Sequence, residues 1–485
     1  MTTSESVWTC PFRHDEALEF DPFLARLRSE PPITRIPMPR GDGAGDATED
    51  GPAASGGSAS ASASASASAS ASGPASAPAP HSAAGAAPGP APGPAPGPDP
   101  ASGPGPGPGP GPGPGSGSPS GAPAAGAAWL VTRHEHVRAV TSDPRFSRAA
   151  LIGRDLPRVT PDLVDHAESI NLMDPPAHSR LRGLVAAAFG ERRVEELRPH
   201  TRRTVDGLLD AMADHGSPAD VSDWLAAPLP LDTVFELLGV PGPDRAPLRR
   251  WATAMMAPGT PDGAAAAEGK AGLRAYFAEL TAARRRHPGN DLLSALAAVR
   301  EDGELLDARE VAVMGMLLLV TGHNTSAHQI SNIVYTLLTH PAQLELLRAR
   351  PELLPSAIEE LLRFIPYRQG VGIPRQATED VELDGVTIRA GETVHVSYLA
   401  ANRDERVYDR PDELDLARQD APAHLTFGHG THHCLGARLA RMELQVAIGT
   451  LLTRFPALRL AVPAEEVRWN TGSIWRFPLA LPVAW

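Results

Sequence analysis

Residues 427–436 read FGHGTHHCLG, and the chain continues with ARLARMELQVAIGTLL. The second stretch has the apolar spacing of an amphipathic helix whose N-terminus lies at about Cys434. The positive end of a helix favours a thiolate over a thiol, and so does a bound metal ion. Gly428, Gly430 and Gly436 allow the backbone to approach a flat macrocycle closely. Cys434 is therefore a candidate ligand of iron through anionic sulfur.

Two other interpretations of Cys434 stay open at this point. A lone cysteine in a large intracellular chain is usually a buried, inert thiol. Zinc is the second alternative, because four histidines lie close in sequence: His424, His429, His432 and His433. A structural zinc site usually has a second ligand pair at fixed spacing, and no other cysteine lies near. Zinc is therefore the less favoured of the two.

The composition is that of a large globular protein with one unusual stretch. Between Gly41 and Gly126, 79 of 86 residues are Gly, Pro, Ala or Ser. Such a segment has too little apolar area to build a core, so we expect residues 41–126 to be a disordered insertion. Strand-like stretches at Ile33–Met38 and Ala128–Thr132 flank it, which places the insertion in the turn of a hairpin. Residues 1–40 and 127–485 should then form one large domain.

Charge and cysteine content exclude several classes of protein. The net charge of −13 argues against general nucleic-acid binding. Cys10 and Cys434 lie too far apart for the disulfide framework of a secreted scaffold. The N-terminus lacks the pattern of a secretory signal, and the longest apolar stretch, Val311–Val320, is about half a bilayer span. We expect a cytoplasmic protein that binds neither nucleic acid nor a membrane.

The periodicity of the remaining chain predicts a mainly α fold with a small β region. Amphipathic helical spacing occurs at Leu181–Phe189, Val194–Asp214, Ala265–Arg286 and Pro341–Arg348. Strand-like alternation occurs at Val381–Ile388, where Asp384 and Gly385 predict a hairpin turn, and at Thr393–Tyr398.

One segment, Val311–Leu338, is apolar on nearly every face over its first ten residues, which predicts a helix through the interior. A polar interruption lies midway along it: Gly322, His323, Asn324, Thr325 and Ser326. Buried polar groups need partners, so a purely structural helix would avoid this pattern and chemistry is a candidate explanation. The alternative for Thr325 is a mid-helix hydroxyl that bonds back to the carbonyl group of Thr321.

The pattern F-G-x-G-x-H-x-C-x-G at residues 427–436 resembles the haem-ligating signature of cytochromes P-450. The resemblance implies the cytochrome P-450 fold, haem b (iron protoporphyrin IX) as cofactor and dioxygen as co-substrate. Cys434 would be the ligand of the haem iron, Phe427 would pack near the sulfur, and His432 would reach a haem propionate. The implied activity is that of an oxidoreductase.

Three further residues resemble the structural network of the family. Glu360 and Arg363 are similar to its helical E-x-x-R pair, and Arg418 occupies the place of the second arginine that joins them. The alternative is a surface ion pair worth under about 1 kcal/mol. The resemblance implies instead a buried, fully satisfied network that supports the haem pocket without taking part in catalysis.

Other charged residues resemble the family's propionate contacts. His178 and Arg182, in MDPPAHSRLR, are similar to its H-x-x-x-R pair, and Arg375 matches a third contact. Two buried propionates need cationic or hydrogen-bonding partners, which forked arginine side chains supply.

The stretch from Thr321 to Ser326 resembles the family's oxygen-activation motif, A/G-G-x-E/D-T/S, with Gly322, Asn324 and Thr325 at its catalytic positions. The resemblance implies that the hydroxyl of Thr325, with an ordered water, donates a hydrogen bond to the dioxygen being activated. Asn324 stands where the family has a carboxylate and cannot titrate near neutral pH, so the acid–alcohol relay is incomplete. Water chains or His323 are the alternatives for proton delivery.

The resemblance also implies partners. Electrons would come from a ferredoxin and its ferredoxin reductase, with the ferredoxin docking near Arg438 and Arg441 on the thiolate side. The small-molecule substrate would be apolar or aromatic, hydroxylated or oxidatively coupled in secondary metabolism, and contacted by Val371, Ile373 and Ile474. The chain looks most similar to actinobacterial members, including phenol-coupling ones such as biflaviolin synthases. A haem-binding carrier and a P-450-like recruitment domain, both without turnover, are the alternatives.

Overall fold

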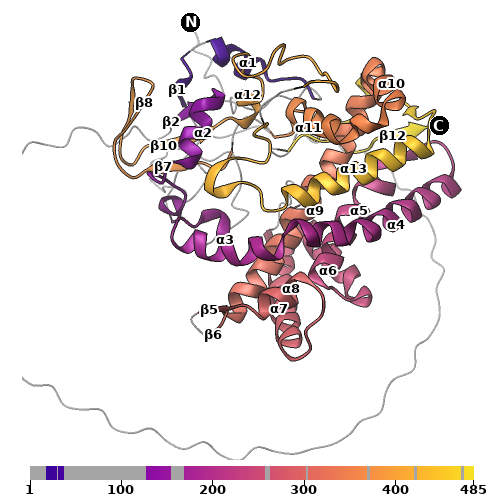
Figure 1. Cartoon of the computed structure of the whole chain (residues 1–485), viewed down its shortest axis with the longest axis horizontal. Coiled ribbons are helices and arrows are strands. Elements are labelled where there is room, and N and C mark those ends of the chain that lie inside the picture. Colours follow the sequence, from indigo (N-terminus) through magenta and orange to yellow (C-terminus); the bar gives the residue numbers. More distant parts are fainter. Residues whose placement is uncertain are drawn as a thin grey trace, which may run out of the picture. The chain divides into compact units, whose positions relative to one another are not determined.

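Helices make up most of the described chain, and the strands are short (Figure 1). The structure is a computed structural model that describes residues 18–29, 31–37, 127–153, 169–256, 263–301, 304–368, 372–419, 423–470 and 475–485. All of these belong to one compact unit, formed by Met1–Gly43 together with Ala122–Trp485. The insertion predicted at 41–126 lies outside the described residues.

The α-helices follow one another along the whole described chain. They are α1 Pro22–Ser29, α2 His134–Ser142, α3 Ala177–Ala188, α4 Glu191–His215, α5 Pro228–Leu238, α6 Arg245–Met256, α7 Gly263–Arg286, α8 Leu292–Ala297, α9 Ala308–Thr339, α10 Pro341–Ala349, α11 Leu354–Phe364, α12 Tyr398–Ala401 and α13 Ala437–Arg454. Shorter helical turns are η1 Ala149–Leu151, η2 Ile170–Leu172, η3 Ser222–Ala226, η4 Gly242–Asp244, η5 Pro351–Leu353, η6 Gly430–His432 and η7 Ala464–Glu466. The four predicted amphipathic segments correspond to α3, α4, α7 and α10, which confirms the mainly α prediction.

The largest sheet has five strands in the order β1-β2-β10-β7-β3. Its strands are β1 Ile33–Pro37, β2 Ala127–Val131, β3 Phe146–Ser147, β7 Arg375–Ala377 and β10 Thr393–Val396. The smaller sheets pair β11 Arg459–Leu460 and β4 Ala219–Asp220 with β12 Pro482–Ala484, β5 Arg300–Glu301 with β6 Glu304–Leu305, and β8 Val381–Leu383 with β9 Val386–Ile388.

Two strand pairings that the sequence predicts are present, β1 with β2 and β8 with β9. β1 and β2 pair antiparallel with Pro37 opposite Ala127, so the chain leaves and re-enters the sheet at neighbouring points. β8 and β9 are joined by Asp384 and Gly385, with φ angles of 49° and 77°. Positive φ at both central residues is what a tight hairpin turn of this kind requires, and an Asp-Gly pair tolerates it.

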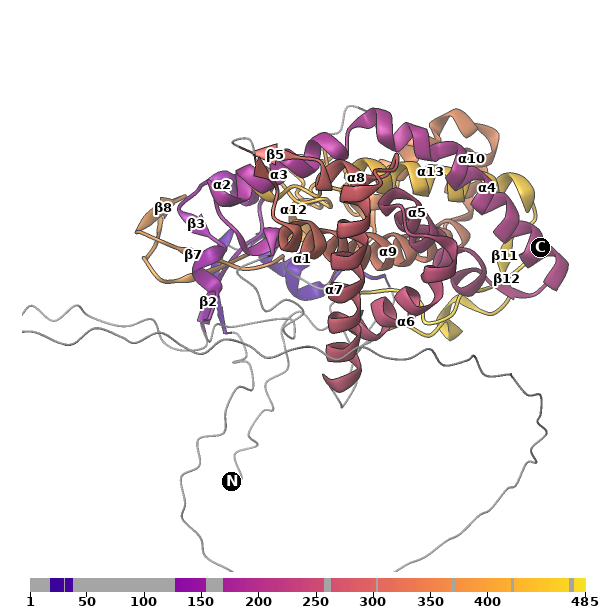
Figure 2. The same cartoon turned by 90° about the horizontal axis from the view of Figure 1, so that it is seen from below.

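Helix α9 runs through the interior, with α7 crossing it and α5 packed against it (Figure 2). Apart from the half-buried Leu317, every residue from Val311 to Val320 is buried, as the apolar pattern predicts. A Cβ atom on Gly315 would lie 2.7 Å from Cδ1 of Phe277, so α7 can approach α9 closely only because this residue is glycine. Among the described helices, none combines the length and apolar character that a bilayer span requires.

Candidate active site

Cys434 lies in the loop between η6 and α13, three residues before the helix begins at Ala437. Its backbone N–H donates to the carbonyl oxygen of Phe427 at 2.8 Å, which closes the loop. Cys434 is a free cysteine with exposed surface, and desolvation by the protein packed around it raises the pKa of its thiol, opposed by the backbone of Gly436 and by Arg182. The thiol is therefore open to a ligand.

The three glycines of this loop differ in whether and why the protein structure requires glycine at their positions. Gly428 and Gly430 have φ angles of 76° and 68°, in the left-handed region that favours glycine. A Cβ atom on Gly430 would also collide with the carbonyl group of Thr141 on α2, so glycine allows the loop to pack on that helix. A Cβ atom on Gly436 would meet no atom of the described residues within 4 Å, so the protein itself does not require glycine there.

The four histidines near Cys434 do not surround its sulfur atom. His424 pairs with Glu359, and Nδ1 of His429 lies 3.1 Å from the hydroxyl of Thr141. The ring of His432 packs on that of His178, with centroids 4.3 Å apart. Within the described ranges, no three His, Cys, Asp or Glu side chains are grouped as metal ligands would be. The arrangement gives the zinc alternative no support.

A cluster of cationic and imidazole side chains lies beside the loop. Arg182, one helical turn after His178 on α3, donates from Nη2 to the carbonyl oxygen of His433 at 2.5 Å. Burial lowers the pKa of His432 to about 2, and the charges that add to this shift come from Arg148, His178, Arg375 and Arg182, in that order. The structure therefore brings together the four residues that the resemblance assigned to the propionates, and adds Arg148.

These groups have more donors than acceptors. Arg375 is 2% exposed, and its Nη1 and Nη2 atoms are buried with no hydrogen-bond partner among the described residues. Nδ1 of His178 and Nε of Arg148 are likewise buried without a hydrogen-bond partner among the described residues. A buried donor without an acceptor costs about 1–3 kcal/mol, and a charged one costs more. The cluster therefore fits a ligand that carries carboxylates, which is what the two propionates of haem supply.

Arg148 is a functional candidate that the sequence did not reveal. It follows β3 directly, and its backbone N–H donates to Oδ1 of Asp174 at 3.0 Å. Burial lowers the pKa of Arg148 to about 9, and repulsion from Arg375 adds to the shift. Only this long-range proximity marks the residue, since nothing in its local sequence distinguishes it from a surface arginine.

The structural network is assembled as the family pattern implies. The guanidinium group of Arg363 donates to both carboxylate oxygens of Glu360 at 2.7 and 2.8 Å, and Arg418 donates to Glu360 at 3.1 Å. Arg363 also donates to the carbonyl oxygens of Asn402 and Pro411 at 2.9 and 2.8 Å. The side chains of Arg363 and Glu360 are 2% and 4% exposed, which excludes the surface ion pair. The network ties α11 to the loop that leads toward Cys434.

On α9, Thr325 makes the hydrogen bond expected of a structural threonine: its hydroxyl donates to the carbonyl oxygen of Thr321 at 3.1 Å. The same oxygen atom keeps lone pairs that can accept a further hydrogen bond. Asn324 is half-buried. His323 is buried, its Nδ1 lies 2.8 Å from the carbonyl oxygen of Leu319, and burial lowers its pKa. Gly322 lies against α5, where a Cβ atom would be 3.0 Å from Cγ2 of Val234.

A second residue that the sequence did not reveal is Glu443 on α13. It is fully buried, and its carboxyl oxygens lie beside the hydroxyls of Ser326 and Thr233 without full hydrogen-bond geometry to either. Burial raises the pKa of Glu443 to about 8, so the group holds a proton at neutral pH. Ser326 follows Thr325 directly, so this proton is close to the polar interruption of α9.

The expected substrate contacts are only partly described. Ile373 is half-buried, while Val371 and Ile474 lie outside the described residues. The ring of Tyr367 stacks on that of Trp475 with centroids 5.1 Å apart, and the hydroxyl of Tyr367 lies 3.0 Å from Nδ1 of His328. Aromatic side chains therefore contact α9 three residues after Thr325.

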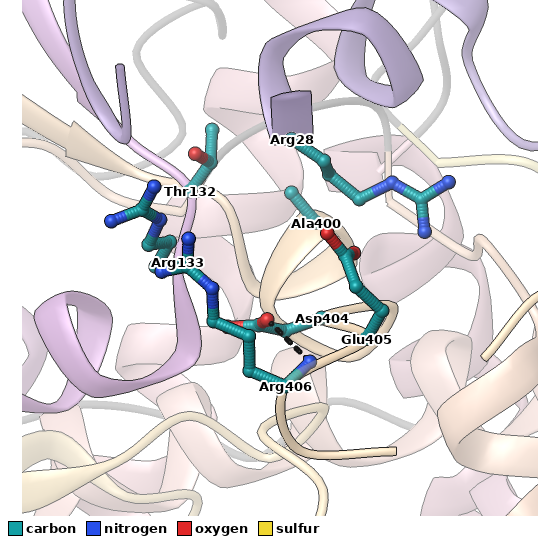
Figure 3. A pocket seen from close by; sticks show the side chains of 7 residues that line it. All are labelled: Arg28, Thr132, Arg133, Ala400, Asp404, Glu405 and Arg406. Carbon is teal, nitrogen blue, oxygen red and sulfur yellow. Dashed lines mark hydrogen bonds between the residues drawn. The ribbon is translucent and has the colours of Figure 1, made fainter. Parts of the chain in front are cut away.

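A small hollow lies apart from these residues (Figure 3). Its lining residues are Arg28, Thr132, Arg133, Ala400, Asp404, Glu405 and Arg406. Its cavity volume is about 10 Å³, which is room for roughly one water molecule. It is too small for an organic substrate.

Comparison with known proteins places this geometry in a family. Residues 270–460 match the family model described as "Cytochrome P450". Nocardicin C N-oxygenase of Nocardia uniformis subsp. tsuyamanensis is 52% identical over 74% of this chain and 89% of that protein. The chain belongs to the cytochrome P450 family. The resemblance drawn from the sequence is thereby confirmed.

Other similar P450s include one that is described as having biaryl coupling reactivity. Biflaviolin synthase of Streptomyces coelicolor is 42% identical over 74% of this chain and 88% of that protein. The solved structure of cytochrome P450mel 107F1, described as having biaryl coupling reactivity, has a TM-score of 0.76 and 50% identity, covering 98% of this chain and 99% of that one. These relatives are named as oxygenases or coupling enzymes, so the carrier and recruitment-domain alternatives find no support.

As a P450, the chain is an oxidoreductase that uses haem and dioxygen. Haem, when bound, supplies an iron centre at which thiolate ligation favours cleavage of the O–O bond. Cys434 would hold the iron, and Arg375, His178, Arg182 and His432 would hold the propionates. The free, exposed thiol and the unpaired donors of Arg375 and His178 both fit this assignment.

Proposed function

We propose that this P450 oxidises an aromatic small molecule of secondary metabolism, by oxidative coupling or hydroxylation, with electrons from a ferredoxin and its reductase. The observation that carries the proposal is the position of the free Cys434 thiol, which lies in a loop next to a cluster of unpaired buried donors. The aromatic substrate is supported by the stacked rings of Tyr367 and Trp475. The biaryl coupling reactivity of P450mel 107F1, which is 50% identical to this chain, supports the reaction type.

At the position assigned to oxygen activation, we assign Thr325 the role of positioning the water molecule that donates the proton. Its hydroxyl oxygen accepts a hydrogen bond from a water molecule while it donates to the carbonyl group of Thr321. Asn324 orients that water through its amide group but releases no proton, because an amide does not titrate near neutral pH. Coupling of two phenols requires removal of hydrogen without insertion of oxygen, and a weakened proton relay is compatible with such a product.

The assignment of a ferredoxin as the electron donor is based on the arginine side chains of α13 near Cys434. The side chain of Arg438 is 61% exposed and pairs with the exposed Glu191 at 2.6 Å. Arg441 is instead held by Glu359 through two hydrogen bonds of 2.7 Å, with its guanidinium group 4.5 Å from the centroid of the Phe427 ring. Of these two arginines, Arg438 is therefore the one that can contact an acidic ferredoxin. Arg441 instead positions the Cys434 loop.

The experiment combines binding with product analysis. The purified holoprotein is titrated with phenolic aromatics such as hydroxynaphthoquinones, and the haem spin-state change is followed by absorbance. Turnover with ferredoxin, reductase and NADPH is then analysed by mass spectrometry. A dimer that has lost two hydrogens, or a product that has gained one oxygen, supports the proposal. Consumption of oxygen without either product for every aromatic ligand that binds would contradict it.

A further inference from the structure

Arg441 on α13 lies against the ring of Phe427, the residue assigned to pack near the sulfur of Cys434. The centre of its guanidinium group lies 4.5 Å from the centroid of that ring. An aromatic face at this distance attracts a cation without neutralising it. The carbonyl oxygen of Phe427 accepts the backbone hydrogen bond of Cys434 at 2.8 Å. The cation, the aromatic residue and the cysteine are therefore linked by direct contacts.

The charge of Arg441 acts on the sulfur of Cys434. Burial raises the pKa of the Cys434 thiol, and the side-chain charges of Arg182 and Arg441 act in the opposite direction. Arg182 is assigned to a propionate, so that group offsets its charge when haem is bound. Arg441 is paired with a carboxylate of the protein instead. The effect of Arg441 on the sulfur is therefore controlled by the protein itself.

The carboxylate that pairs with Arg441 belongs to Glu359 on α11. Nε and Nη2 of Arg441 donate to its two oxygen atoms, each at 2.7 Å. Nε2 of His424 lies 3.2 Å from Oε2 of Glu359. Burial acts to raise the pKa of Glu359, but the hydrogen bonds from His424 and Arg441 lower it to about 2. At neutral pH the pair is therefore a cation and an anion in fixed positions, with the cation in contact with Phe427.

Charges in such a position affect a one-electron reduction of the haem iron. Reduction adds a negative charge, which a nearby cation favours and a nearby anion opposes. The side chains of Arg441 and Glu359 are 31% and 40% exposed, so solvent screens them less than it screens a fully exposed pair. Arg441 and Glu359 should therefore act on the reduction with opposite sign.

We propose that Glu359 and Arg441 together set the reduction potential of the haem iron held by Cys434. Arg441 favours the reduced state, and Glu359 limits this effect by offsetting part of the charge of Arg441. Glu359 is thus a positioning residue, which acts through Arg441 and Phe427. This inference depends on the haem thiolate and goes beyond the proposed function, because it requires neither the aromatic substrate nor the ferredoxin.

The test is a spectroelectrochemical titration of the substrate-free holoprotein at one pH and ionic strength, with small redox mediators in place of a ferredoxin. Glu359→Gln should raise the reduction potential and Arg441→Gln should lower it. Each should change the equilibrium constant for reduction by about threefold or more, which is about 30 mV for one electron. The chain with both substitutions should return close to the potential of the unsubstituted protein. Arg441→Lys keeps the charge and should shift the potential less than Arg441→Gln.

The opposite signs separate an effect of charge from a structural one. Loss of the two hydrogen bonds disturbs the loop from either side, so a structural role would shift both potentials in the same direction. Arg350→Gln and Glu352→Gln are the matched controls, because this pair has side chains 51% and 66% exposed and should leave the potential unchanged. Unchanged potentials for Glu359→Gln and Arg441→Gln, or shifts of the same sign, overturn the proposal. If only one of these two variants retains haem, the sign of its shift decides.

The carbon monoxide spectrum of each reduced sample separates this inference from the other assignments. A thiolate band in every sample, together with unchanged potentials, would refute the role of the Glu359–Arg441 pair alone. An unsubstituted holoprotein without the thiolate band would refute Cys434 as the iron ligand and the inference with it. Failure of every aromatic ligand to react would contradict the proposed function and leave the potentials unaffected.

Discussion

Buried charge at single residues explains most of what the sequence could not predict about this site. Cys434, Arg375 and His178 are identified from their motifs, because the spacing of each motif is fixed along the chain. Arg148 and Glu443 have no such motif, and each is distinguished only by where distant elements place it. Nε of Arg148 and both carboxyl oxygens of Glu443 are buried without a full hydrogen bond, a property of the folded structure that local sequence does not record.

The first prediction concerns Arg375. Its Nη1 and Nη2 atoms are assigned to a propionate, and a hydrogen bond to a charged group contributes about 1.5–3 kcal/mol. Arg375→Gln should therefore release haem about tenfold or more faster, as measured by transfer to apomyoglobin. Arg389→Gln, an exposed arginine of the same β region, is the control. Equal rates for Arg375→Gln and the unsubstituted protein would refute the assignment.

The second prediction concerns the pH dependence of stability through Glu443. Its pKa rises from 4.5 in the unfolded chain to about 8 in the folded one. Between these values the folded state keeps a proton that the unfolded state has lost, so the free energy of unfolding decreases as pH rises. Glutamine resembles the protonated acid and cannot lose that proton.

Glu443→Gln should therefore raise the melting temperature, and should raise it more at pH 8 than at pH 5. Thermal unfolding followed by circular dichroism at both values gives the comparison. The same gain at both values, or a larger gain at pH 5, would show that Glu443 is not protonated in the folded protein.

At the scale of elements, α9 was predictable because ten successive apolar residues leave a helix no polar face. The amphipathic helices α3, α4, α7 and α10 were predictable for the complementary reason that each shows one apolar stripe. Strands such as β3 and β4 are two residues long, so they contain no alternation that a sequence pattern could display. They exist because their partners in other parts of the chain supply hydrogen bonds.

The third prediction tests the network that fixes α11. Arg363→Lys replaces a forked donor by a single point charge, so the bonds to Glu360, Asn402 and Pro411 cannot all be kept. We expect the free energy of unfolding to fall by about 3 kcal/mol or more, as for other broken buried ion pairs. Urea titration provides the measurement.

Arg350→Lys is the matched control for this experiment, because Arg350 and Glu352 form an exposed pair with side chains 51% and 66% exposed. It should change stability by less than about 0.5 kcal/mol. A similarly small effect for Arg363→Lys would mean that the network does not support the fold.

At the scale of the whole molecule, the pairing of β1 with β2 determines what we expect when residues 41–126 are removed. Pro37 lies opposite Ala127, so a short turn can join the two strands without moving either. We predict that the shortened protein keeps its haem absorbance and the carbon monoxide band of the full chain. A shortened protein that folds but shows a different band would mean that the insertion contributes to the haem site.

The bond between the sulfur of Cys434 and haem iron underlies every other assignment at this site. The measurement is the absorbance difference on adding carbon monoxide to the dithionite-reduced holoprotein, with Cys434→His as the comparison. We predict the strongly red-shifted Soret band of thiolate-ligated haem for the natural chain and its absence in the variant. A natural chain that binds haem and folds but shows only the band of imidazole-ligated haem would contradict this bond.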